Sequence, residues 1–349
     1  MTVYRIDPLL DSRWPAFLQR HPHSSVFHTP EWLAALRKTY GYSPVAFTTS
    51  TQGEELKNGI VSCCISSWLT GRRMVSLPFS DHCQPLVDHP EELRLLTSCL
   101  KEHMDREKWK YIELRPVVSS DWGLEKQASY VRNEKFYFHR LDLRPDLDDL
   151  FRSFHKSCVQ RKIRRAERER LAYEAGRSEA ILSKFYHLLL LTRRRHQLPP
   201  QPVAWFRNLV DCLGDRLTIR VLSKGDQPVA SILTLSYKTT VVYKYGCSDA
   251  RFHNLGGMPL LFWRAIQAAK QCGSQEFDLG RSEVNNPGLS AFKEHLGATR
   301  SELSYFRLTE HGLDGHPRHH QMQAIRRVLG GMPDSMAQLA GQVLYRHMG

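Results

Sequence analysis

A loop between a predicted strand and a predicted helix carries the first residues whose types and spacing could do chemistry. The stretch VVYKYGCSDARFHNLGGMPLLFWRAIQAAKQCG, residues 241–273, is predicted to form a strand, a loop with two adjacent glycines and a helix. Backbone N–H groups and the positive end of the dipole at a helix start can bind a phosphate. The loop therefore predicts an anion site at Arg251, Asn254, Gly256 and Gly257. A plain structural crossover would carry a similar pattern.

Two acidic residues belong to the next predicted strand and the loop after it: Asp278 lies within the strand and Glu283 follows it. In EFDLGRSEV, Arg281 and Glu283 come at the carboxyl end of the strand, a common place for ligands in α/β folds. Glu283 is a candidate general base, because an attacking amine must lose a proton during acyl transfer. Asp278 is the structural alternative, an acid within the strand that hydrogen bonds can satisfy.

The segment PFSDHCQP places Ser80, Asp81, His82 and Cys83 next to one another. Side chains of adjacent residues diverge, so sequence proximity alone does not make a catalytic triad. We predict instead a loop that lines a cleft between two domains, with His82 able to contact an acceptor substrate.

The net charge of +13 favours an anionic partner: nucleic acid, a phosphorylated or carboxylated substrate, or a membrane surface. Residues 152–170 contain eight Lys or Arg against two Glu and are predicted to form one basic helix. This helix is either an anion-binding face or a solvated helix with ion pairs such as that of Arg165 with Glu169.

Cysteine spacing gives no sign of a metal. The eight cysteines form no C-x-x-C pair, so a zinc ribbon is not predicted and no metal site is expected. The sequence shows neither a secretory signal nor an apolar run long enough for a membrane span. We therefore expect a cytoplasmic protein, with room for peripheral contact at the inner face of the membrane.

One order of elements occurs twice: three strands, a helix and a strand. The first copy is predicted at residues 43–50, 58–69, 72–79, 90–109 and 111–116, and the second at 217–223, 227–237, 239–248, 258–273 and 276–280. The repeat predicts two similar mixed α/β domains, residues 1–145 and 146–310, followed by a helical tail at 311–349. The tail is predicted as two short helices broken at Gly330-Gly331 and Pro333.

The loop at Arg251-x-x-Asn254-x-Gly256 resembles the R/Q-x-x-G-x-G/A loop of GNAT-type acyltransferases, with Asn at the first glycine position. The chain also resembles the FemAB-like aminoacyltransferases over most of residues 24–305. The similarity rests on FHTPEWLAALRKTYGY, RKIRRAERERLAYEAG, VYKYGCSDARFHNLGGMPLLFWRAI and FDLGRSEVNNPGLSAFKEHLGA. It implies two tandem GNAT-like domains, each a central mixed sheet flanked by helices.

The resemblance also implies roles for single residues. Phe292-Lys293 matches the family's Phe-Lys motif, whose lysine lies beside the reacting acyl group and could stabilise an oxyanion or hold a donor phosphate. Tyr243 and Tyr245 match a strand that borders the acceptor site, and we expect both to face the same side. Near the N-terminus the family's lysine is replaced by Leu36, with Arg37 next, which departs from the site for a nucleotide-linked muropeptide.

The sequence thus predicts an acyltransferase that moves an acyl group from acyl-CoA to an amine of a cell-envelope glycan or peptide precursor. No tightly bound cofactor is expected, because an ester or thioester carbonyl is already activated. Two alternatives stay open. One is an aminoacyltransferase of the peptidoglycan-bridge type that uses aminoacyl-tRNA, which the basic charge favours. The other is a non-catalytic module that binds anions on a degenerate GNAT fold.

Overall fold

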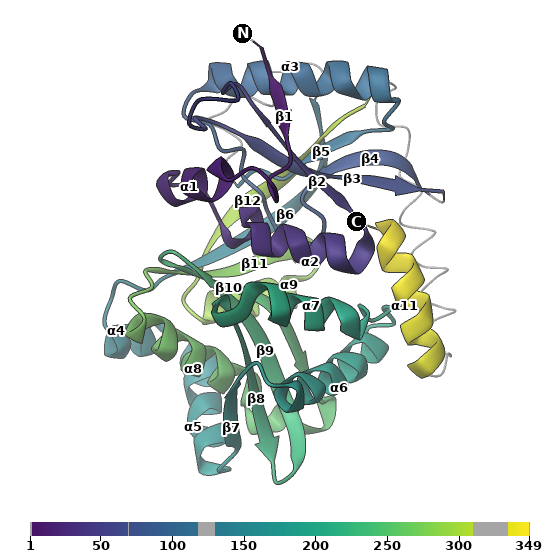
Figure 1. Cartoon of the computed structure of the whole chain (residues 1–349). Coiled ribbons are helices and arrows are strands. Elements are labelled where there is room, and N and C mark those ends of the chain that lie inside the picture. The colour runs from purple at the N-terminus through teal and green to yellow at the C-terminus, as the bar shows by residue number, and fades with distance from the viewer. Residues whose placement is uncertain (1, 69, 118–129, 310–333, 349) are drawn as a thin grey trace. The chain divides into compact units, whose positions relative to one another are not determined.

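The computed structural model describes residues 2–68, 70–117, 130–309 and 334–348 (Figure 1). Its contacts divide the chain into two units. The first unit comprises Met1–Phe136 and two later segments, which begin at Glu302 and at Val343. The second unit comprises Tyr137–Ser301 and the described residues 334–342. The first change of unit, after Phe136, thus comes earlier than the predicted junction near residue 145. None of the described helices is both long and apolar enough to span a membrane.

The first unit is built on strands in the order β1-β2-β3-β4-β5-β12, of which β12 begins in the second unit and belongs to the first from Glu302 on. The strands are β1 (Tyr4–Ile6), β2 (Ser43–Thr48), β3 (Ile60–Ser67), β4 (Gly71–Ser76), β5 (Ile112–Leu114) and β12 (Thr299–Leu308), and the helices are α1 (Arg13–Arg20), α2 (Pro30–Tyr40) and α3 (Pro90–Glu107). The α3 helix begins with Pro90 at its first position and buries Leu93, Leu96 and Leu100 in the core of this unit. It is the crossover between the parallel strands β4 and β5.

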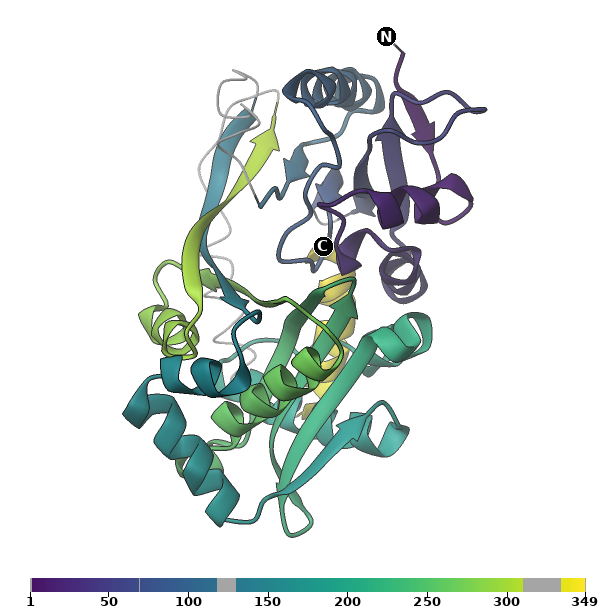
Figure 2. The same ribbon diagram turned by 90° about the vertical axis from the view of Figure 1, so that its left-hand side faces the viewer.

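The second unit has strands in the order β6-β11-β10-β9-β8-β7, of which β6 begins in the first unit and belongs to the second from Tyr137 on. They are β6 (Tyr130–Asp142), β7 (Ala172–Gly176), β8 (Leu217–Lys224), β9 (Gln227–Tyr237), β10 (Thr240–Ser248) and β11 (Glu276–Glu283). The helices are α4 (Leu147–Ser153), α5 (Arg161–Arg168), α6 (Glu179–Arg195), α7 (Val203–Leu213), α8 (Gly257–Gln271) and α9 (Pro287–His295). Helices α5 and α8 lie side by side, as Figure 2 shows, and bury Ile163, Leu261 and Ile266 in one core cluster.

The predicted repeat of elements is confirmed. In both copies two antiparallel strand pairs are followed by a helix and a parallel pair: β2, β3, β4, α3, β5 and β8, β9, β10, α8, β11. Gly225 and Asp226 form the turn between β8 and β9, and Gly225 has a positive φ of 58°. Of the predicted tail, the second helix is α11 (Asp334–Met348), and the first helix and the breaks at Gly330-Gly331 and Pro333 lie outside the described residues.

The prediction of one continuous basic helix at 152–170 is wrong. Helix α4 ends at Ser153, Phe154 is extended, and a π-helical turn over Lys156–Gln160 leads into α5. Phe154 is buried against Trp263, with ring centroids 5.6 Å apart, and the backbone N–H of His155 donates to the carbonyl oxygen of His295 (2.9 Å). These non-local contacts replace the hydrogen bonds that a continuous helix would need at this point.

His28, in the first unit, is a buried neutral histidine. Its Nδ1 accepts from the backbone N–H of Ser25 (3.0 Å), and its Nε2 lies 2.8 Å from the carbonyl oxygen of Gln84. The N–H of Ser25 only donates and the Gln84 carbonyl only accepts, so the proton sits on Nε2. Burial lowers the pKa of His28 to about 4.

This pKa predicts a loss of stability in mild acid. The pKa of His28 is lower in the folded state than its value of about 6.5 in the unfolded state. The stability that neutral His28 contributes is therefore fully present above about pH 6.5 and is lost as the pH falls towards 4. Between pH 6 and pH 5 the wild type should lose about 1 kcal/mol of unfolding free energy more than His28→Gln, measured by urea unfolding. Equal losses in the two proteins would contradict the assignment.

Candidate functional site

Strands β10 and β11 pair over only part of their length. Their parallel register joins Thr240, Val241 and Val242 to Glu276, Phe277 and Asp278, whereas both strands run on beyond these residues. Beyond these residues β10 has a register shift between Tyr243 and Tyr245. In β11 the backbone of Gly280 is left-handed, with a φ of 69°. Asp278 Oδ1 accepts from the N–H of Gly280 (2.7 Å), as expected of an acid within a strand that hydrogen bonds satisfy.

The two tyrosines of β10 face opposite sides of the sheet, so the expectation that they share a side is wrong. The Tyr243 ring packs on Phe262 of α8, with centroids 4.8 Å apart. Tyr245 accepts a hydrogen bond at its hydroxyl from Trp205 Nε1 (2.9 Å) of α7, and pairs with Leu233 across the sheet. The register shift adds one residue, Lys244, between them, and such a bulge reverses the alternation of side chains.

Lys293 lies on α9 and is buried, with 2% of its surface exposed. Its Nζ donates to the carbonyl oxygens of Gly280 (3.0 Å) and Arg281 (2.8 Å), in the part of β11 beyond the pairing with β10. The ammonium is therefore held in place by two rigid elements. A positive charge fixed in this way can stabilise a developing negative charge without reorganising.

His139 of β6 is the titratable neighbour of Lys293 that the sequence did not reveal. It is fully buried, and its Nε2 lies 3.7 Å from a carboxylate oxygen of Glu294. Burial, together with the charge of Lys293, lowers the pKa of His139 to about 4. His139 is therefore neutral at pH 7. A histidine within a strand gives no sequence sign of such a role.

A short chain of aromatic rings connects Tyr243 to the helix that carries Lys293. Phe262 stands between them, with its ring centroid 4.8 Å from that of Tyr243 and 5.5 Å from that of Phe292. The structure therefore brings three of the predicted residues, Tyr243, Phe292 and Lys293, into one region. The sequence missed Phe262 because an aromatic residue on an apolar helix face is typical of any core.

The predicted donor loop is a 3₁₀ turn, Ala250–Leu255, that enters α8 at Gly256. Arg251 is exposed, but its guanidinium forms an ion pair with the buried Asp249 (2.6 Å), which also accepts from the Arg251 backbone N–H (3.0 Å). These hydrogen bonds hold the pKa of Asp249 below its usual value. Asn254 is exposed. Binding of a donor phosphate at this loop stays a prediction.

Gly256 and Gly257 are buried, and Gly256 has a packing role. A Cβ at Gly256 would lie 2.3 Å from the backbone oxygen of Lys162 in α5, and its φ of 79° also disfavours other residues. A Cβ at Gly257 would lie 3.2 Å from the Cβ of Ala230. The glycines thus let α8 begin against α5 and β9, which accounts for their presence without a ligand.

Of the remaining predicted residues, Glu283 and Arg281 lie on β11, and His82 and Arg37 belong to the first unit. Glu283 is exposed at the end of β11, and Arg281 contributes its carbonyl to Lys293. His82 is buried with its ring edge on Phe27, centroids 5.3 Å apart, and Arg37 on α2 lies 3.9 Å from Asp7. The role of Glu283 as general base and the role of Arg281, His82 and Arg37 in acceptor binding stay predictions.

Comparison with known proteins supports the second unit most directly. Residues 153–294 match the family model described as Acetyltransferase (GNAT) domain. These residues include the basic helix α5, the divergent strands β10 and β11, and most of α9. The chain has no match among the curated proteins.

Solved structures show the fold over most of the chain. The crystal structure of FemX aligns with a TM-score of 0.69 at 17% identity, over 88% of this chain and 97% of that one. L-PGS from Bacillus licheniformis aligns with a TM-score of 0.57 at 14% identity, over 91% of this chain and 96% of that one. A tandem GNAT protein from the clavulanic acid biosynthesis pathway aligns with a TM-score of 0.56 at 10% identity, over 88% of this chain and 98% of that one. The predicted fold class, mixed α/β with tandem GNAT-like domains, is confirmed.

Proposed function

We propose that this chain, whose residues 153–294 form a GNAT-type acyltransferase domain, transfers an acyl group from acyl-CoA to the amine of a cell-envelope glycan or peptide precursor. The observation that carries the proposal is the placement of Lys293. Within that domain a buried ammonium is fixed at the point where β11 leaves β10. The description of the matching family as an acetyltransferase supports a thioester donor.

The reaction needs no redox step. The amine nitrogen attacks the thioester carbonyl, a C–N bond forms, and the carbonyl oxygen becomes an oxyanion. When the oxyanion collapses, the C–S bond breaks, the thiolate leaves, and the amine proton passes to a base. The chain must therefore supply a positive group for the oxyanion and an acceptor for one proton.

In our proposal Lys293 supplies the positive charge, and the exposed carboxylate of Glu283 at the end of β11 accepts the amine proton. Phe292 contributes to the apolar wall of the site through Phe262. The donor phosphates bind at the turn that enters α8, where Arg251 is the exposed cation.

Among the proposed acceptor residues Tyr243 has the strongest support, because it lies on the same side of the sheet as Phe262. The support for Tyr245 is weaker, because its hydroxyl already accepts a hydrogen bond from Trp205 on the other side of the sheet. We keep Arg281, and His82 and Arg37 of the first unit, as proposed acceptor contacts. An acceptor of the cell envelope would place the protein in the cytoplasm, in peripheral contact with the membrane.

The experiment that tests the proposal measures donor consumption. Purified full-length protein is incubated with acetyl-CoA and a panel of amino sugars and amine-bearing peptidoglycan precursors, and free CoA thiol is followed over time. We expect thiol release that depends on one acceptor and is lost in Lys293→Met. Binding of acetyl-CoA without release for any amine would support the non-catalytic alternative.

A second donor, aminoacyl-tRNA, is favoured by one observation. Helix α5 carries five Lys or Arg and one Glu over Arg161–Arg168, and all six are exposed, while Ile163 and Ala166 face the core. This face has the charge needed to contact phosphates. The same amine-dependent assay with charged tRNA, scored by loss of the aminoacyl ester, distinguishes this donor from acyl-CoA.

If tRNA is the donor, replacing Arg161, Arg164 and Arg168 with Gln should weaken its binding, because each replacement removes one phosphate contact. The slope of log K against log salt concentration should fall by about 2 to 3. The matched control replaces Arg94, Lys101 and Arg106, exposed bases of α3 in the first unit, and should leave the slope unchanged. If the two triple variants reduced the slope equally, tRNA binding would depend on the net charge of the protein and not on α5.

A further inference from the structure

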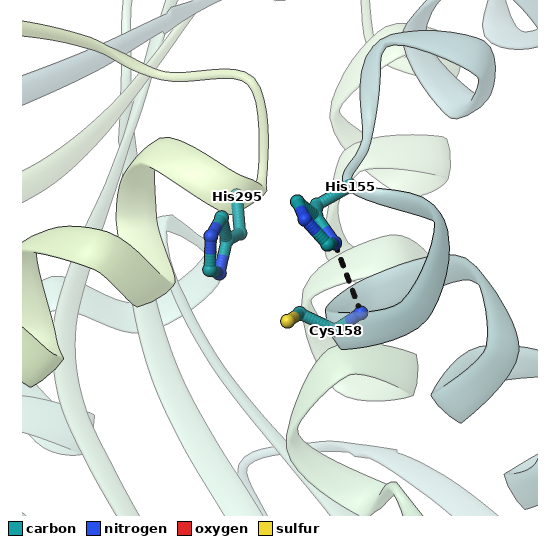
Figure 3. A group of neighbouring side chains, drawn as sticks. All are labelled: His155, Cys158 and His295. Atoms are coloured by element: carbon teal, nitrogen blue, oxygen red, sulfur yellow. Dashed lines mark hydrogen bonds between the residues drawn. The ribbon is translucent and has the colours of Figure 1, made fainter.

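Three metal-ligating side chains from two distant parts of the second unit meet at one place. His155 and Cys158 lie around the π-helical turn before α5, and His295 is the last residue of α9. One ligand atom of each lies within 4.8 Å of the others. Figure 3 shows the Cys158 thiol directed from its helix towards the two imidazole rings, whose centroids are 4.4 Å apart.

The backbone holds these residues together independently of any metal. The N–H of His155 donates to the carbonyl oxygen of His295 (2.9 Å), which ties the start of the turn to the end of α9. His155 Nδ1 accepts from the N–H of Cys158 (3.2 Å) and caps the turn. The spacing of three residues between His155 and Cys158 puts both on one side of a helical turn.

We propose that His155, Cys158 and His295 form a zinc site. Two imidazoles and one thiolate are the donors that zinc prefers, whereas magnesium and calcium require oxygen ligands. Three protein ligands leave one tetrahedral position for water, and His155 is exposed, so solvent reaches the cluster. The proposal departs from the expectation of no metal, which rested on C-x-x-C spacing and did not consider histidine with cysteine.

Zinc binding requires the three ligand atoms to move closer together. Bonds of about 2.0–2.3 Å to tetrahedral zinc place ligand atoms roughly 3.3–3.6 Å apart, which is shorter than the present limit of 4.8 Å. Binding also requires a lone pair on His155. Coordination through Nδ1 replaces the hydrogen bond from Cys158, and coordination through Nε2 moves the ring proton to Nδ1 and breaks the same bond.

The bound metal would connect α9 to the segment that leads into α5. Since α9 carries Lys293, the zinc would hold that helix in place, although the site itself does not rest on the proposed acyl transfer. Such a cross-link joins residues far apart in the sequence, and metal that binds only the folded chain raises its stability.

Cobalt titration of the full chain tests the site. The protein, purified with a tag that contains no histidine and stripped with EDTA under reducing conditions, is titrated with Co²⁺. We expect one ion per chain, a thiolate-to-cobalt charge-transfer band and the strong visible bands of four-coordinate cobalt, all displaced by Zn²⁺. Saturating Zn²⁺ should raise the Tm by about 5–10 °C.

Three variants and one control decide the outcome. Cys158→Ser should abolish the charge-transfer band and weaken Zn²⁺ binding by at least about 100-fold, the upper end of what loss of an outer partner costs. His295→Gln and His155→Asn should weaken it similarly, and asparagine still caps the turn, so that variant keeps the local fold. Cys272→Ser, an exposed cysteine of the same unit, should bind as wild type. Absence of stoichiometric binding, or a band that survives Cys158→Ser, would overturn the proposal.

Discussion

Replacing Lys293 with methionine is expected to lower kcat for acyl transfer about 10²- to 10³-fold, the usual effect of removing one group that stabilises an oxyanion. Methionine is also long and unbranched, so the loss is mainly that of the charge and its donors. KM for the donor should change less than kcat, because the interaction develops in the transition state. Steady-state kinetics with the acceptor found by thiol release measure both constants.

The same substitution also leaves the carbonyls of Gly280 and Arg281 without this donor, at about 1–3 kcal/mol each. Lys270→Met is the matched control, because Lys270 Nζ donates to the carbonyl oxygens of Leu143 (2.6 Å) and Pro145 (2.5 Å) in the same unit. The Lys270→Met protein should be less stable than the wild type and should keep the wild-type kcat. A Lys293→Met protein that is folded and retains the wild-type kcat would show that Lys293 only supports β11.

Gly256→Ala is expected to lower the unfolding free energy of the second unit by about 2–5 kcal/mol. A Cβ there would lie 2.3 Å from the Lys162 backbone oxygen and 2.9 Å from its carbonyl carbon, so α5 and α8 must separate. Overpacking of this kind costs about 1–3 kcal/mol. The left-handed backbone, with φ of 79°, adds about 1–2 kcal/mol for any residue with a Cβ. Urea unfolding measures the sum.

Gly273→Ala separates the two contributions. Gly273 has nearly the same φ, 76°, but an added Cβ there meets nothing within 4 Å. Its loss should therefore be about 1–2 kcal/mol, the backbone part alone. If both alanine variants lose the same unfolding free energy, the contact with Lys162 does not require glycine at position 256. Packing would then not explain Gly256, and its presence would again support a phosphate site.

The strands and helices of the two repeated copies could be predicted because their apolar runs are local signals. The bounds of β9 are those read from QPVASILTLSY, and α3 starts at the predicted Pro90. Strand β7 was missed because it is largely exposed, so burial imposes no pattern on its side chains. β6 was missed because charged residues interrupt its alternation.

The candidate site was predictable in part. Phe292 and Lys293 were identified by resemblance, but the burial of Lys293 depends on carbonyls that β11 supplies, which no spacing within α9 reveals. The basic helix was predicted as continuous because its composition is helical throughout. The break at Phe154 comes from contacts with Trp263 and His295, which are distant in the sequence.

Lys244 has the properties of a one-codon insertion. Tyr243 pairs with Thr234 and Tyr245 with Leu233, so the extra residue has no partner position of its own on β9. Its deletion would keep each neighbouring side chain on its present side of the sheet and opposite its present partner. What would disappear is the local bend, which such a bulge adds to a strand. The bulge of β10, which follows directly after the pairing with β11, is thus encoded separately from the rest of the fold, and the insertion or deletion of one codon could add or remove it.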